Sequence, residues 1–413
     1  MQAEVSILDR TLAALPRLRV CVVTETYPPE VNGVALTVAR CVEALRTRGH
    51  EVHLVRPRQP GETASEGDVL CAGMPVPGYA GLRMGLPAPG RLRQLWTAQR
   101  PDVVHVITEG PLGWSAMRTA QAMRIPVVSD FHTNFHSYGR HYGWGWLTSL
   151  IYRYLRNFHN AAQLSLVPTR AMRERLASDG FRRLDVVARG VDTELFRPER
   201  RDPALRAQWG LGDDDLAVLH VGRLAPEKNL PLLLEAFTAL RARQPRARLV
   251  LVGDGPERAA LAESHCQPLI AGVQRGIELA RHYASADMFV FPSLTETFGN
   301  VTLEAMASGL AVLAYDYAAA AEHIEHGESG WLATYDDPAS FVQGACWLAT
   351  AGSERVAIGD TAARNACMLD WERVIDALER ALVRTVQAET PMLQAPPLHR
   401  RSSVPSAGAR RSG

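Results

Sequence analysis

Two glutamates, Glu296 and Glu304, stand in a Glu-x7-Glu spacing on either side of a predicted helix start near Val301. The apolar run 288–291 just before them predicts a buried strand. A helix N-terminus beside a glycine, here Gly299, is a ready site for an anion, whereas a carboxylate in the first turn suits hydroxyl groups. The stretch predicts a site for a phosphate attached to polyols, as in a nucleotide sugar. The alternative is a solvated helix start with an acidic cap.

This stretch resembles the signature of retaining glycosyltransferases of the GT-B class, family 4. The resemblance rests on the two glutamates, on Phe298-Gly299 between them and on Glu304-Ala-Met-Ala-Ser-Gly309. It implies that Glu304 binds ribose hydroxyls and that Glu296 binds hydroxyls of the transferred sugar. It also implies donor contacts from the residues between and beside the glutamates, which are Thr297, Phe298, Gly299, Asn300 and Val301.

Two cations follow the predicted strand 216–222, in the order Gly222-Arg223-x4-Lys228. Arginine offers a planar fork to phosphate oxygens, and lysine offers a mobile point charge. The spacing resembles a family 4 motif whose cations hold the donor diphosphate as it leaves. By that resemblance Arg223 and Lys228 are catalytic. Without the neighbouring motifs, two surface cations would be the better interpretation.

Glycines at two other predicted strand ends are candidates for donor contact. Gly33 follows the strand 17–24 and a loop with two prolines, and Gly253-x-Gly255 follows the strand 248–252. Ligand loops of open α/β sheets lie at such strand ends, although the dinucleotide fingerprint Gly-x-Gly-x-x-Gly is absent at the first. The resemblance implies that Gly33 approaches the diphosphate and sugar, and that Gly253 and Gly255 flank the nucleotide. A plain turn between strand and helix is the alternative for Gly33.

His132 lies just past the predicted strand 127–130. A single histidine is more often structural, but this position resembles the family 4 histidine beside the donor sugar. The resemblance implies that His132 positions the sugar through its carbonyl or its ring and does not abstract a proton. His105 and Glu109 follow the preceding strand and could face the same cleft.

Strands and helices alternate along the chain, which predicts parallel sheets. The fold class expected is α/β, a GT-B arrangement of two Rossmann-like, doubly wound domains with a cleft between them. The charged run 198–215 is interpreted as a solvated connection with a short helix. The boundaries predicted are 1–16 for an N-terminal extension, 17–195 for the acceptor domain, 196–370 for the donor domain, 371–389 for a helix packing back on the first domain, and 390–413 for a disordered tail.

Composition excludes several classes of protein. The 413 residues carry 45 basic and 44 acidic side chains, so bulk capture of nucleic acid is not expected. Six scattered cysteines favour a reducing cytoplasm over a disulfide framework. No apolar run is as long as a membrane span, and residues 1–17 do not resemble a secretory signal. We expect a cytoplasmic protein, soluble or peripheral on the inner face of the plasma membrane.

Two clusters of arginine and aromatic residues are candidates for the acceptor or for an anionic membrane surface. One spans 79–96 and the other 138–154. An acceptor pocket or ordinary core packing would explain them equally. Their candidate residues are Arg83, Arg91, Arg93, Tyr142, Trp144 and Trp146.

The resemblance points to bacterial GDP-mannose-dependent α-mannosyltransferases and related glycolipid enzymes. It implies a retaining transfer of a mannose or glucose-type hexose from GDP-mannose or a UDP-hexose to a lipid such as diacylglycerol or a phosphatidylinositol-like lipid. It implies no cofactor and no metal, because the cations and the helix end supply the charge. The one Asp-x-Asp, 213–215, follows a linker glycine and not a cleft-facing strand. The alternatives are a soluble or polysaccharide acceptor, an epimerase or hydrolase of the same fold, and a non-catalytic binding module.

Overall fold

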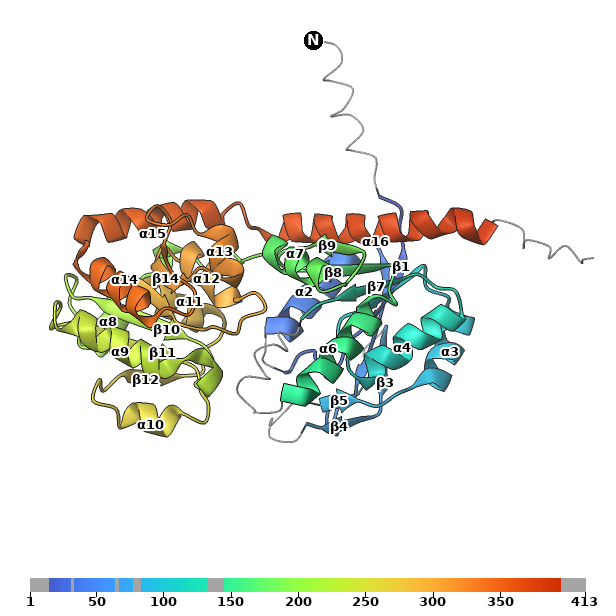
Figure 1. Cartoon of the computed structure of the whole chain (residues 1–413), viewed down its shortest axis with the longest axis horizontal. Helices are drawn as coiled ribbons and strands as arrows, with labels where there is room; N and C mark the ends of the chain where they lie inside the picture. Colours follow the sequence, from blue (N-terminus) through green and yellow to red (C-terminus); the bar gives the residue numbers. More distant parts are fainter. Residues whose placement is uncertain (1–14, 31–32, 64–66, 77–82, 133–144, 395–413) are drawn as a thin grey trace, which may run out of the picture.

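The structure is a computed structural model that describes residues 15–30, 33–63, 67–76, 83–132 and 145–394. It contains two α/β units that lie side by side, and the last helix, α16, runs along the first unit (Figure 1). Each unit is built on its own parallel sheet. The predicted α/β fold class is confirmed.

The first sheet has seven strands in the order β3-β2-β1-β6-β7-β8-β9. Its strands are β1 Arg19–Val23, β2 Glu51–Pro57, β3 Asp68–Cys71, β6 Val103–Val106, β7 Val127–Asp130, β8 Leu164–Val167 and β9 Leu184–Val186. Its helices are α2 Gly33–Thr47, α3 Pro89–Ala98, α4 Pro111–Ala122, α6 Gly145–His159 and α7 Arg170–Ser178. A two-stranded antiparallel sheet, β4 Gly73–Pro75 with β5 Arg83–Gly85, stands apart from the main sheet.

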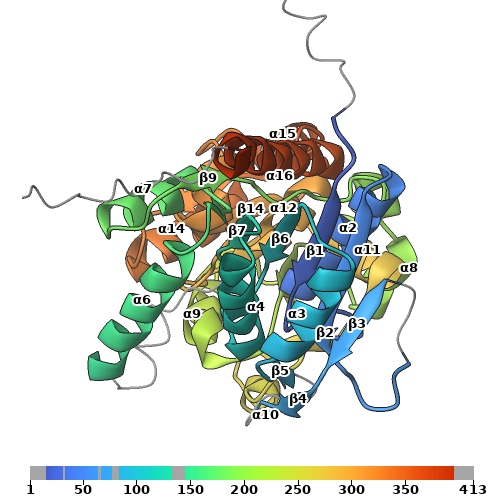
Figure 2. The same ribbon diagram turned by 90° about the vertical axis from the view of Figure 1, so that its right-hand side faces the viewer.

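Both faces of this sheet are buried, as the continuous apolar runs predict. In β1, Val20 and Val22 face one core, and Cys21 and Val23 face the other. The first core is covered by α2 and α16, and the second by α3, α4 and α6. Figure 2 shows α3 and α4 as neighbours on their side of the sheet.

The second sheet has six strands in the order β12-β11-β10-β13-β14-β15. They are β10 Ala217–Val221, β11 Arg248–Val252, β12 Leu269–Gly272, β13 Met288–Phe291, β14 Ala311–Tyr315 and β15 Trp331–Ala333. The helical elements are η2 Pro198–Arg200, α8 Pro203–Gln208, η3 Pro226–Lys228, α9 Leu230–Arg241, α10 Arg258–Ala262, α11 Gly276–Ser285, α12 Asn300–Ala307, α13 Ala318–His323, α14 Pro338–Thr350 and α15 Gly352–Ala366.

The last helix, α16 Trp371–Gln394, leaves the second unit and packs on the first. Leu378, Ala381, Leu382 and Val383 join the core formed by β1, β2 and α2. The helix continues to Gln394, so the tail predicted to begin at residue 390 begins later. That prediction relied on the Pro, Ser and Arg content of the whole segment, which says little about where the helix stops. Residues 395–413 lie outside the described part.

Ion pairs hold α16 to the first unit. The Arg48 guanidinium, at the end of α2, lies 2.6 Å from Glu372 and from Asp376 and 2.8 Å from Glu379. His50 Nε2 lies 3.0 Å from the second oxygen of Glu379. A buried apolar seam is therefore bordered by charge-assisted contacts, which fix the helix in one register.

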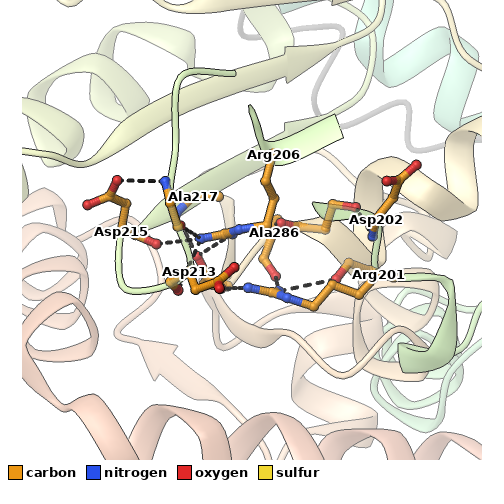
Figure 3. Close-up of polar contacts among 11 residues, drawn as sticks. Arg201, Asp202, Arg206, Asp213, Asp215, Ala217 and Ala286 are labelled. Atoms are coloured by element: carbon orange, nitrogen blue, oxygen red, sulfur yellow. Dashed lines mark hydrogen bonds and ion pairs between the residues drawn. The ribbon is translucent and has the colours of Figure 1, made fainter. Parts of the chain in front are cut away.

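The run 198–215 contains the short helix predicted for it, α8, but part of the run is buried and not solvated. Arg206 of α8 is 2% exposed and donates to the carbonyls of Ser285, Gly212 and Asp215 and to the Asp287 carboxylate, at 2.7–3.0 Å (Figure 3). Asp215 in turn accepts from the Gly212 amide at 2.8 Å. The second residue of the Asp-x-Asp sequence is thus used inside this network, where its carbonyl is one of the acceptors that meet the two terminal nitrogens of the buried guanidinium.

Arg206→Ala should destabilise the second unit by about 3–5 kcal/mol, because it removes the buried cation beside the Asp287 carboxylate and the donor to three carbonyls. Urea unfolding measures the change. Arg201→Ala is the matched control, because Arg201 is 40% exposed and pairs with the same carboxylate at 2.8 Å. It should cost about 1 kcal/mol or less. Equal losses in the two variants would contradict the buried-network explanation.

Candidate active site

The Glu-x7-Glu stretch forms the loop and helix start expected for it. Gly299 has φ +94°, a left-handed conformation that favours glycine, and α12 begins at the next residue. Glu296 lies in the loop that follows β13, and Glu304 lies one turn inside the helix. The N–H groups at the start of α12 therefore lie between the two carboxylates.

Lys228 reaches across from the loop after β10 and forms an ion pair with Glu296 Oε1. The same oxygen accepts from Ser293 Oγ at 2.7 Å. Burial alone would raise the pKa of Glu296, but Lys228 and the hydrogen bonds hold it below its ordinary value. Glu296 is therefore an ionised acceptor, although its side chain is only 15% exposed.

Lys228 is the only lysine among the 45 basic residues of the chain. Every other permanently cationic side chain is arginine, whose planar fork suits bidentate pairing. The ammonium of Lys228 lies 5.4 Å from the centre of the Phe291 ring as well as against Glu296. The site thus carries a compact point charge on a flexible stem where the rest of the protein uses a guanidinium.

Glu304 has a different environment. Its Oε2 accepts a hydrogen bond from the Tyr283 hydroxyl of α11 at 2.9 Å, and no cation contributes to its shift. Burial raises the pKa of Glu304 to about 7, with the Tyr283 hydrogen bond acting in the opposite direction. Near neutral pH Glu304 is therefore present in both its protonated and its ionised form, whereas Glu296 is ionised.

The first unit closes the other side of the site. The His132 carbonyl accepts a hydrogen bond from Thr297 Oγ1 at 2.9 Å. A side-chain carbon added to Gly33 would lie 3.3 Å from Asn300 Nδ2. His132 and Gly33, each at the end of a strand or loop of the first unit, thus meet the loop and helix that carry the glutamates.

Arg223 lies on the same loop as Lys228 but farther from the glutamates. Its guanidinium lies 2.8 Å from Glu227, and its side chain is 44% exposed. The glycines Gly253 and Gly255 hold this loop in place, because added side chains there would lie 1.9 Å from the Gly222 carbonyl and 2.3 Å from the Leu224 carbonyl. The close backbone approach requires glycine at both positions.

Some predicted residues have other surroundings. The Phe298 ring is 5% exposed and packs in the core, so only its backbone can reach a ligand. Trp96 from the first aromatic cluster is a core residue, 1% exposed, and Arg83 donates to the Gly73 carbonyl between β4 and β5. Both belong to a cluster that was predicted to form a surface from its composition. The residues that they contact, Cys21 and Gly73, lie outside that cluster, so the cluster alone could not reveal these contacts.

Arg91 and Arg93 are exposed on α3. Tyr142 and Trp144 lie outside the described residues. Trp146 lies in α6, but its side chain is not among those described.

Three polar residues around the site carried no signal in the sequence. Asp130 lies at the end of β7 between His105 and His132, at 2.7 and 3.2 Å, and Arg189 donates to His132 Nδ1. His220 Nδ1, on β10, donates a hydrogen bond to the Val290 carbonyl at 3.0 Å, and burial lowers the pKa of His220 to about 4. The position of Arg189 directly before Gly-Val-Asp could have drawn attention, but nothing local links it to His132.

Comparison with known proteins identifies the family. Residues 31–195 match the model described as Glycosyltransferase Family 4, and residues 215–351 match Glycosyl transferases group 1. The GDP-mannose-dependent alpha-mannosyltransferase of Mycolicibacterium smegmatis is 34% identical over 370 residues, which cover 87% of this chain and 96% of the relative. This protein belongs to glycosyltransferase family 4.

Another relative and a solved structure are also similar to this chain. The alpha-monoglucosyldiacylglycerol synthase of Acholeplasma laidlawii is 28% identical over 346 residues, covering 76% of this chain and 84% of the relative. The structure of sucrose-phosphate synthase from Thermosynechococcus elongatus superposes with a TM-score of 0.72 at 18% identity, over 90% of this chain and all of that one. The predicted GT-B fold and the predicted glycosyltransferase class are confirmed.

The Glu304 carboxyl makes the stability of this glycosyltransferase depend on pH. The unfolded group ionises near its ordinary pKa of 4.5, whereas the folded group keeps its proton up to about pH 7. The folded state therefore binds more protons between these values, and stability falls as the pH rises through about 7, by up to roughly 3 kcal/mol. Glu304→Gln should lack this loss and should be the more stable protein at pH 8.

Urea unfolding of both proteins at pH 5 and pH 8 measures the difference. Glu25 also has its pKa raised to about 7 by burial, so the wild type and the variant must be compared at each pH to isolate Glu304. The control is Glu235→Gln, at an exposed position of α9. If Glu304→Gln loses as much stability from pH 5 to pH 8 as the wild type does, the assigned environment is wrong.

Proposed function

We propose that this glycosyltransferase transfers mannose from GDP-mannose to a lipid acceptor, with retention of anomeric configuration and without a metal ion. The observation that carries the proposal is the contact of Lys228 with Glu296 at the start of α12, facing His132. A cation for phosphate and a carboxylate for hydroxyls stand side by side there. The names of the relatives, a GDP-mannose-dependent mannosyltransferase and a glucosyldiacylglycerol synthase, support the donor and the acceptor.

The donor would replace the internal ion pair with two separate contacts. Lys228 would turn from Glu296 to the diphosphate, and the N–H groups at the start of α12 would add their positive end. Glu296, ionised, would accept hydrogen bonds from hydroxyls of the sugar, while Glu304 would accept from the ribose. Arg223, half-exposed on the same loop, would close on the diphosphate from outside.

The transfer itself would need no side-chain base. The bond from the anomeric carbon to the phosphate oxygen breaks, and a bond from the same carbon to the acceptor oxygen forms on the same face. The acceptor hydroxyl gives its proton to the leaving phosphate. The role of Lys228 and Arg223 is to stabilise the negative charge that grows on the diphosphate, which is worth about 2–4 kcal/mol per donor group in comparable sites.

Lys228→Ala should lower turnover by about 30- to 1,000-fold in the presence of EDTA while the fold is kept. Because Lys228 is the only lysine, the extent of its acetylation by an amine-selective reagent reports donor binding directly. GDP and GDP-mannose should protect Lys228, as measured by mass spectrometry. Acetylation of the N-terminal amine, measured in the same molecule, is the internal control.

Each part of the proposal has its own contrary outcome. Protection by UDP and not by GDP would overturn the choice of donor. Loss of activity in EDTA that Mg²⁺ restores would overturn the metal-free mechanism. Release of free sugar or an epimer at the full rate without acceptor would favour the hydrolase or epimerase alternative.

We also propose that the first unit rests on an anionic membrane when it meets a lipid acceptor. Exposed apolar residues, Met74, Leu86, Leu150 and Tyr154, lie on the β4–β5 region and α6, and Arg91 and Arg93 are exposed on α3. The β4–β5 hairpin and α6 lie towards the same end of the first unit in Figures 1 and 2. No helix in the described residues has both the length and the apolar character to cross a bilayer.

Flotation with vesicles containing anionic lipid tests this surface. The double variant Arg91→Ser/Arg93→Ser should bind about 30-fold more weakly, at about 1 kcal/mol per basic residue, and wild-type binding should weaken with salt. Arg243→Ser/Arg380→Ser removes two exposed arginines from α16 and the turn after α9 and should change little. Equal binding of both double variants, or no binding of the wild type at low salt, would leave a soluble acceptor as the better proposal.

A further inference from the structure

A chain of polar contacts lies behind the carbonyl of His132. Arg189, in the segment that crosses between the two units, places Nη2 2.5 Å from His132 Nδ1. His132 Nε2 lies 3.2 Å from Asp130 Oδ2, and the other Asp130 oxygen lies 2.7 Å from His105 Nε2. The side chains of His132, His105 and Asp130 are 4%, 3% and 13% exposed, so these contacts lie almost out of water.

The direction of the contact between Arg189 and His132 is fixed by chemistry. A guanidinium has five N–H groups and no acceptor, so the ring nitrogen it meets must carry a lone pair. His132 is then the neutral tautomer with its hydrogen on Nε2, on the side of Asp130. The two ring nitrogens are thereby assigned, and the ring has no lone pair left to act as a base.

We infer that Arg189 is a positioning residue that holds His132 in one neutral tautomer and one orientation, so that its backbone carbonyl is presented to the donor sugar. This rests on the proposed donor-site role of His132. In this structure the same carbonyl accepts from Thr297 Oγ1, a hydroxyl group, at 2.9 Å. A hydroxyl of the sugar would take the same acceptor.

The charges around His132 agree with this role. Burial lowers the pKa of His132, Arg189 lowers it further, and Asp130 acts in the opposite direction. Burial alone would raise the pKa of Asp130, but the two histidines hold it below its ordinary value. The titratable and charged groups facing this cluster come from α2, β6 and its loop, β7 and the crossing segment, and they are Cys41, His105, Glu109, Asp130 and Arg189.

Loss of Arg189 should therefore move His132 towards the imidazolium form. Burial still lowers the pKa of His132 in such a variant, but the Arg189 charge that lowers it further is gone, while the Asp130 carboxylate that raises it remains. Nδ1 then becomes free to take a proton, and the ring can turn. Any loss of activity is expected at acid pH, because the ring takes up a proton only as the pH falls.

Three substitutions separate charge from hydrogen bonding. Arg189→Lys keeps both, Arg189→Gln keeps a donor without charge, and Arg189→Met keeps neither. In Arg189→Met, kcat/KM for the donor should be about tenfold lower at pH 6 than at pH 8, and in Arg189→Gln less so. The wild type and Arg189→Lys should stay nearly level. Arg40→Gln is the matched control, because Arg40 pairs with Asp192 of the same crossing segment and does not touch His132.

A second measurement determines the protonation state and tautomer of the His132 ring without any substrate. In full-length protein with ¹⁵N-labelled histidine, the His132 signals, assigned from their loss in His132→Gln, should show a neutral ring protonated on Nε2 from pH 6 to pH 8. Arg189→Met should show a titrating ring in that window. This outcome does not depend on which donor or acceptor the enzyme uses, so it can fail or succeed apart from the proposed function.

The inference is overturned if wild-type His132 is protonated on Nδ1, or if its ring titrates alike in the wild type and Arg189→Met. It is also overturned if the acid loss of activity persists in His132→Gln/Arg189→Met, because another group would then cause it. Should Arg189→Met fail to fold, the comparison of Arg189→Gln with Arg189→Lys decides the same question.

Discussion

A buried carboxylate is stable only beside a cation, and at Glu296 that cation is Lys228. The pair ties the loop after β10 to the loop after β13, and these loops are neighbours because the two strands pair in parallel. Each group balances the charge of the other. When a donor binds, each partner would exchange the other for a group of the ligand, so the site can load without leaving a charge unpaired.

The two sides of the interface between the units are built differently. On the side of α16, an apolar seam and the ion pairs of Arg48 join the units. At the site, the described contacts are a hydrogen bond from Thr297 to the His132 carbonyl and the approach of Asn300 to Gly33. Contacts of the second kind are easily exchanged for a ligand, whereas the first kind holds the units together throughout.

The same acid group behaves in opposite ways at the two ends of the Glu-x7-Glu spacing. Glu296 is held ionised by Lys228, and Glu304 has only the Tyr283 hydroxyl and a pKa near neutrality. The difference follows from the neighbours that other strands and helices supply. If the proposed roles are right, the sugar and the ribose of the donor would meet carboxyl groups in different protonation states.

The amino-acid sequence by itself determined the sheets and the stretches that bear the site. Short β-branched runs predicted the central strands, because burial on both faces leaves an unbroken apolar pattern, and the glycines and prolines marked the loops at their ends. The short strands β3, β4, β5 and β15 carried too little pattern to be recognised. Spacing, residue type and the resemblance to family 4 together selected Lys228, Glu296, Glu304 and His132 as candidates, and strand ends of a parallel sheet converge on one edge.

Only the tertiary structure decided what each side chain meets. The sequence around Trp96 and Arg206 predicted exposed positions, yet both side chains are buried. Trp96 contacts Cys21, 75 positions away, and Arg206 contacts Asp287, 81 positions away. The contact of Arg189 with His132 spans 57 residues, and that of Thr297 with the His132 carbonyl spans 165. Protonation states and tautomers follow from such contacts, because burial and nearby charge set them, and neither is a property of the local sequence.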